Sequence, residues 1–238
     1  METPKKIIFV RCVSALAIVV GTLVMAAWVF QVPFLKSFIF DVITMKFRTA
    51  LCFLFSGIIL YTMTARMDGR KNLKKYLLLI FSALILLIMI PSFIAISTGS
   101  YFDAFRPILL LSSDYSIEET YLEMPSIGTI IAFIFIGLSS TFVYAFPAYS
   151  RFFLLYAGSI VHFLATIAII GFLIRSPLLY YEIQHISAGM SLHAAILFLL
   201  LGIGFLLLGE TKNKVCPHFK GMVNEETLMC TYDWKKHK

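Results

Sequence analysis

The chain has 238 residues, of which 60% are hydrophobic and only 14% charged, and its mean hydropathy is +0.89. Soluble domains are roughly 45–50% apolar and about 25% charged, so a water-soluble globular fold and a disordered chain are both excluded. The four cysteines are too few and too scattered for a disulfide scaffold. The composition therefore predicts an integral membrane protein.

Six uncharged apolar stretches follow one another, each close to the roughly 20 residues that a helix needs to cross a bilayer. They show no sustained alternation with polar residues, so helices are expected instead of a β-barrel. Pro91 is the clearest helix breaker inside a stretch. We predict an all-α integral membrane fold, a six-transmembrane helix bundle built from three helix pairs, in residues 1–209, and a short basic tail in residues 210–238. The predicted spans are residues 12–30, 49–65, 76–96, 127–146, 152–174 and 190–209.

The basic residues indicate the orientation of the bundle. If the N-terminus is cytoplasmic, 15 of the 20 Lys and Arg residues lie inside, because the turn at 66–75 and the tail are rich in them. Such an excess is typical of the cytoplasmic side. We therefore predict a multi-pass protein of the cell membrane with both termini in the cytoplasm, and we attribute the formal net charge of +7 to contact with anionic lipid instead of nucleic acid.

The second, fourth and sixth spans share a pattern near their starts. Each carries a small residue, a phenylalanine and a glycine at steps of four, which places the three on one helix face. Small residues on such a face let helices approach closely in a bilayer. We interpret the pattern as an internal repeat that packs around a common axis, and lining a ligand site is the alternative. Its members are Thr49, Phe53 and Gly57; Thr129, Phe133 and Gly137; and Ala194, Phe198 and Gly202.

The same repeat carries a resemblance. Residues 28–38 and 45–53, with Met-Ser-Leu-His-Ala-Ala-Ile-Leu-Phe at 190–198, resemble the N-terminal integral-membrane region of prokaryotic sensor histidine kinases and diguanylate cyclases. The resemblance covers roughly residues 13–209 and implies a region that anchors and senses. The catalytic domains of that family have no room here, because only 29 residues follow Gly209. We expect a stand-alone membrane module or a fragment of a longer sensor.

Polar residues in and between the spans are the candidates for ligand or signal recognition. His162 lies mid-span, where a hydrogen bond to a neighbouring helix is the structural interpretation and a functional role is the alternative. His193 lies near the start of the last span, so the two histidines differ too much in depth to share a haem. Asp103 and Arg106, in the long loop 97–126, are candidates for a small-ligand site, with a solvated acidic cap as the alternative.

Basic residues also flank the second span on its predicted external side. Lys36, Lys46 and Arg48 are expected to reach lipid phosphates with their charged ends, and anion sensing is the alternative.

The tail contains weak zinc candidates, since two thiolates and two imidazoles suit a tetrahedral site. Their spacing matches no common zinc knuckle, so neither a metal nor another cofactor is expected. No nucleophile with a base, and no paired acids, indicate an enzyme. The four tail candidates are Cys216, His218, Cys230 and His237.

The preferred function is therefore a non-enzymatic, sensor-like or anchoring membrane module that relays a signal. Its expected partners are the bilayer and a histidine kinase, another signalling protein or a second copy of the chain. The alternative is a small transporter or channel for an apolar or weakly polar ligand. A dry axis packed by Gly and Phe favours the sensor. A water-filled path favours the transporter, and its candidate lining is Ser139, Ser140, Thr141, His162 and Thr166.

Overall fold

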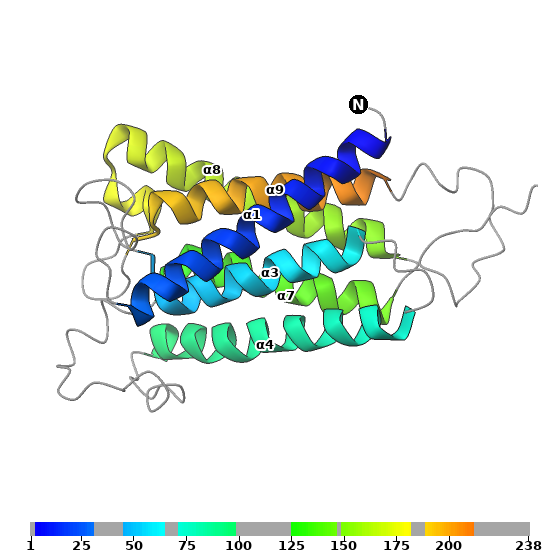
Figure 1. The fold of residues 1–238 in the computed structure, drawn as a ribbon. Coiled ribbons are helices and arrows are strands. Elements are labelled where there is room, and N and C mark those ends of the chain that lie inside the picture. The colour runs from blue at the N-terminus through cyan, green and yellow to red at the C-terminus, as the bar shows by residue number, and fades with distance from the viewer. Residues whose placement is uncertain are drawn as a thin grey trace, which may run out of the picture.

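The computed structural model describes residues 3–30, 45–64, 71–98, 125–146, 149–181 and 189–211. Within these ranges the chain is all helical, and six helices are long and apolar enough to cross a membrane (Figure 1). The predicted fold class is confirmed. The helices are α1 (Thr3–Val29), α3 (Phe47–Thr64), α4 (Lys71–Thr98), α7 (Ile127–Ala145), α8 (Ser150–Ile174) and α9 (Leu192–Thr211), and a short 3-10 helix, η2 (Pro177–Tyr180), follows α8.

The helices extend beyond the apolar stretches at their charged ends. α1 begins at Thr3 and α4 at Lys71, because lysine and arginine can stay helical while their charged ends reach the membrane surface. Pro91 does not break α4, which continues to Thr98. Proline removes one backbone donor, but membrane helices tolerate it where neighbouring helices and hydroxyl groups compensate.

The six helices form a closed ring of three pairs. The most extensive contacts lie within the pairs α1–α3, α4–α7 and α8–α9. The next most extensive run from each pair to the following one, between α3 and α4, α7 and α8, and α9 and α1. Figure 1 shows α1 lying against both α3 and α9, so the last helix closes the ring onto the first.

Each pair contributes one inner and one outer helix to the ring. In α3, α7 and α9, 50%, 56% and 56% of the span is buried inside the protein, whereas the share is 33% in each of α1, α4 and α8. We call the first three the inner helices and the other three the outer helices. The outer helices therefore present most of their surface to lipid.

Glycine allows the two backbones of the first and third pairs to meet. A Cβ atom on Gly57 would lie 2.8 Å from the carbonyl oxygen of Ser14, and one on Gly202 would lie 2.8 Å from the amide nitrogen of His162. In the second pair, a Cβ atom on Gly137 would lie 2.9 Å from the Leu86 side chain and 3.4 Å, an ordinary contact distance, from the carbonyl oxygen of Ser82.

The three repeat glycines thus face their outer partners and not the common axis. Four residues turn a helix by about 40° more than one full turn. Over the two steps from the small residue to the glycine, the pattern therefore rotates away from the common axis.

The outer helices carry a repeat as well, which was not predicted from the sequence. Each inner glycine faces two outer-helix positions four residues apart. Residues 14–16 and 82–84 both read Ser-Ala-Leu, which is the detectable trace of this repeat. The paired positions are Ser14 and Ile18 in α1, Ser82 and Leu86 in α4, and Gly158 and His162 in α8.

Polar contacts tie the helix ends together where the chain begins. Lys6 of α1 forms an ion pair with Glu210 of α9, and Arg11 donates a hydrogen bond of 3.2 Å to the carbonyl oxygen of Thr64 at the end of α3. α1 is thereby fastened to both of its inner neighbours at this end.

The glycine contacts generate a graded prediction. Gly57→Ala and Gly202→Ala should each lower the free energy of unfolding by about 1–3 kcal/mol, because the new methyl group collides with backbone. Gly137→Ala should lower the free energy of unfolding by a smaller amount, because the Leu86 side chain can move. The measurement is thermal unfolding of the purified variants in detergent. An equal loss in all three variants would contradict the backbone contacts.

Candidate functional site

Three phenylalanines meet on the common axis of the ring. Phe53, Phe133 and Phe198 are each 0% exposed, and their ring centroids lie 5.0, 4.6 and 4.7 Å apart. Two of the three contacts are edge-to-face, a favourable geometry for aromatic rings. We call this group the phenylalanine layer. It fills the axis with side chains from all three inner helices.

The axis stays filled on the side of the layer towards the chain termini. Residues three and seven positions after each phenylalanine are buried, so the inner helices continue to face one another there. These residues are Ser56, Ile136 and Leu201, followed by Leu60, Ser140 and Phe205.

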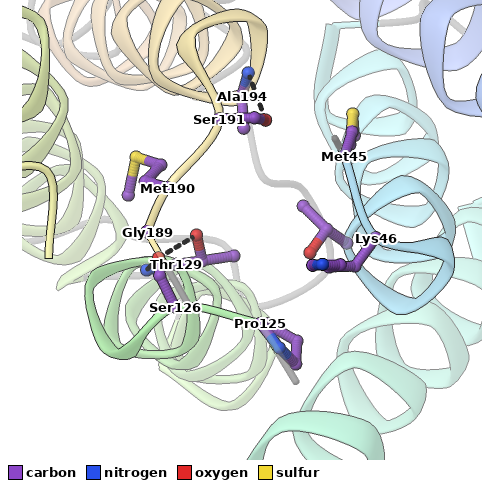
Figure 2. A pocket seen from close by; sticks show the side chains of 10 residues that line it. Met45, Lys46, Pro125, Ser126, Thr129, Gly189, Met190, Ser191 and Ala194 are labelled. Atoms are coloured by element: carbon purple, nitrogen blue, oxygen red, sulfur yellow. Dashed lines mark hydrogen bonds between the residues drawn. The ribbon is translucent and has the colours of Figure 1, made fainter. Parts of the chain in front are cut away.

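On the other side of the layer the axis opens into a small hollow, which we call the axial hollow. It is shallow and open at its mouth, with room for about one water molecule. Most of its walls come from the positions eight, seven and four residues before each phenylalanine, so the internal repeat builds it. The residues that line it are Met45, Lys46 and Thr49; Pro125, Ser126 and Thr129; and Gly189, Met190, Ser191 and Ala194 (Figure 2).

Hydroxyl groups are the main polar groups of the hollow. Ser126 and Thr129 share a hydrogen bond of 2.7 Å, and the Ser126 hydroxyl also accepts from the Thr129 amide at 3.2 Å. Ser191 caps α9 by accepting from the Ala194 amide at 3.4 Å. The Thr49 side chain is 4% exposed and forms no hydrogen bond with the described residues. Several hydroxyl protons are therefore available to a ligand.

Three helix N-termini and one lysine lie at the hollow among the described residues. The inner helices α3, α7 and α9 all begin here, and none has an acidic residue in its first turn. Helix N-termini carry partial positive charge. Figure 2 shows the Lys46 side chain pointing from the start of α3 into the hollow. None of the described lining residues is acidic.

Hydrogen bonds to backbone carbonyl groups connect the rim of the hollow to α1 and to η2. The Trp28 indole donates to the carbonyl oxygen of Met45 at 3.0 Å, and the Met190 amide donates to that of Tyr180 at 2.7 Å. Tyr181 packs against Gly128 and donates its hydroxyl to Leu164 at 3.1 Å. Burial raises the pKa of Tyr181, so this hydroxyl stays protonated and able to donate.

Four of the five polar side chains proposed for a water-filled path are bonded locally, and His162 is the exception. Ser139 and Ser140 donate to the carbonyl oxygen of Ile136 at 3.0 and 2.7 Å. Thr141 bonds to Ser82 at 3.1 Å, and Thr166 donates to His162 at 2.8 Å. These groups therefore satisfy one another and the helix backbone within the packed bundle.

The structure separates the two candidate histidines. His162 packs against Gly202, and its Nδ1 atom is buried without a hydrogen-bond partner. His193 lies in the first turn of α9, nine residues and about 13 Å along the axis from Gly202. The two side chains are not brought together.

The remaining site predictions are untested. Asp103 and Arg106 lie outside the described residues, as does the tail with its four zinc candidates. Among the described residues, no three His, Cys, Asp or Glu side chains are grouped to hold a metal ion. The expected absence of cofactors stays a prediction.

The phenylalanine layer generates a prediction about stability. Phe133→Ala should lower the free energy of unfolding by about 3–5 kcal/mol, because it leaves a cavity that closely packed neighbours cannot fill. Phe163→Ala on the lipid-facing side of α8, where the ring is 63% exposed, is the matched control and should cost much less. Unfolding in detergent measures both. Equal losses would argue against a central layer.

Comparison with known proteins adds no assignment to this geometry. No protein-family model, no curated protein and no solved structure matches the chain. The functional interpretation therefore depends on the helices, the phenylalanine layer and the axial hollow.

Proposed function

We propose that the chain is a non-conducting, non-enzymatic membrane module that recognises a ligand at the axial hollow and relays its occupancy to a partner. The single observation that carries this proposal is the phenylalanine layer beneath the hollow. Its three rings lie within 5.0 Å of one another and are fully buried. A ligand that enters the hollow therefore meets a closed floor instead of a path between the inner helices.

The relay follows from the position of the hollow. Its walls come from the first turns of α3, α7 and α9 and from the residues just before them, one helix from each pair. A ligand that bonds to all three walls changes the relative free energy of arrangements in which the pairs lie closer together or farther apart. A signalling protein or a second copy of the chain that contacts the outer helices can respond to that change.

The positive-inside pattern supports an external position for the hollow and a cytoplasmic position for the tail. A receptor for an external signal requires this arrangement. The resemblance to sensor-kinase membrane regions supports the same proposal, because those regions precede the signalling domains.

Solute flux through reconstituted liposomes tests the proposal. Liposomes that contain the full chain should leak potassium, chloride and glycerol no faster than empty liposomes, because the phenylalanine layer leaves no wetted path. Phe163→Ala, which changes only a lipid-facing ring, should behave in the same way. Protein-dependent flux of any of these solutes through the wild-type chain would overturn the proposal and favour the transporter.

A further inference from the structure

We propose that two copies of the chain associate in the membrane through the lipid-facing side of α8, which packs against the α8 of a second copy. The inference deepens the proposed function, because it names the partner that responds and the surface that this partner contacts. It rests on that function only for its biological role. Its physical basis is the composition of one helix face.

One side of α8 is uncovered along most of the helix. Six exposed or half-buried positions follow one another at alternating steps of four and three residues, a spacing that lets one helix pack along a second helix. We call these positions the α8 outer face. They are Phe152, Tyr156, Ser159, Phe163, Thr166 and Ile170.

Hydrogen-bonding groups lie at the α8 outer face in the middle of the membrane span. The Ser159 side chain is exposed and forms no hydrogen bond with the described residues. His162 is the middle residue of α8, is half-buried and lies beside Ser159 on the helix surface. Neither of its ring nitrogens bonds to a described residue, and Nδ1 is buried, so only Nε2 can reach a group outside the copy. Lipid tails offer no hydrogen bond to these groups.

The other two outer helices differ from α8 on their lipid-facing sides. In α1 the exposed Thr22 hydroxyl donates to the carbonyl oxygen of Ile18 at 2.8 Å, so it is satisfied within its own helix. The exposed Cys12 thiol of α1 is only a weak donor. In α4 the exposed residues from Ile80 to Ile94 are all apolar. The unbonded hydroxyl in mid-span therefore distinguishes α8 as the contact surface.

A second copy fits this surface because its hydrogen-bonding groups are self-complementary. A hydroxyl and a neutral imidazole can each donate and accept a hydrogen bond. Copies inserted in one bilayer share their orientation, so a two-fold axis along the membrane normal makes the two α8 helices parallel and brings each residue to the depth of its equivalent. Ser159 and His162 of each copy then meet those of the other. No charged residue lies in the sequence between Arg151 and Arg175, so like charges do not oppose the contact.

The α8 outer face is also large enough for a specific contact. Phe152, Tyr156 and Phe163 are between 57% and 63% exposed. An aromatic side chain offers about 150–250 Å² of surface, so the exposed parts of the three rings amount to roughly 350 Å² in each copy. With the three other side chains, two copies together remove on the order of 1,000 Å² from lipid, which is the size at which specific interfaces begin.

Energy transfer between two fluorescent versions of the full chain tests the proposal. Donor and acceptor proteins are fused to the C-terminus, and the two versions are reconstituted together in liposomes at increasing ratios of lipid to protein. Transfer should fall along a monomer–dimer curve as lipid dilutes the protein, and an excess of unlabelled chain should abolish it. Transfer no greater than random proximity produces, at every ratio, would contradict the proposal.

Two substitutions test whether the contact lies on α8. Ser159→Ala removes only the hydroxyl and should weaken association about three- to ten-fold, the scale of an interhelical hydrogen bond. Phe163→Ala removes a ring that faces lipid in a single copy, so each copy should still fold while association weakens at least as much. Thr22→Val on α1 and Leu87→Ala on α4 are the matched controls and should associate as the wild type does. Thermal unfolding in detergent establishes that each variant is folded.

The outcomes separate the contact from its competitors. If Ser159→Ala and Phe163→Ala both associate as the wild type does, the contact is not on α8 and the proposal is wrong. A lipid-soluble small molecule is the competing occupant of the outer face. Its release by organic solvent from a monomeric wild-type protein, and not from Ser159→Ala, would also refute the dimer.

The flux measurement is independent of this test. A monomeric, non-conducting chain would refute the α8 contact and leave the proposed function standing. A dimer that conducts solutes would refute the proposed function and leave the α8 contact standing.

Discussion

The contact among Phe53, Phe133 and Phe198 determines how the rest of the bundle can pack. Three rings with centroids 4.6 to 5.0 Å apart keep the backbones of α3, α7 and α9 away from one another. Each inner helix therefore makes its closest backbone approach to its own outer partner, at glycine in the first and third pairs. The hollow begins one turn along the axis from the layer, where the shorter side chains of Thr49, Thr129 and Ala194 leave space.

Packing has to hold this bundle together, because lipid tails are as apolar as its side chains and burial alone gives little driving force. The buried hydroxyl groups fit this requirement. Ser56 donates to Cys52 at 2.7 Å and Ser140 to Ile136 at 2.7 Å, so these serines are satisfied within their own helices. The hydroxyl groups around the hollow differ, since part of their donor capacity is unused by the described residues. The unused hydroxyl donors are therefore found where the helices begin.

Much of the fold could be predicted from the sequence, and the limits have a physical cause. The spans and the three phenylalanines could be predicted, because the length of an apolar stretch and a spacing of four residues are both properties of a single helix. The outer-helix repeat was harder, because lipid-facing and buried positions are both apolar, and only the Ser-Ala-Leu of residues 14–16 and 82–84 marks it. The hollow was not predicted as a site, although Lys46 and the repeat were singled out separately. Lys46 and the residues of the repeat come together only when the three helix pairs have packed.

The contact between α1 and α9 has a consequence for how the protein is made. α1 emerges from the ribosome first, but one of its two inner neighbours is the last helix of the ring. At about 5–20 residues per second, α1 waits roughly 10–30 s in the membrane before α9 is synthesised. During that time the α9-facing surface of α1 is covered by lipid. A late stop codon that removes α9 deprives α1 of this neighbour and the hollow of one wall, which leaves the ring open.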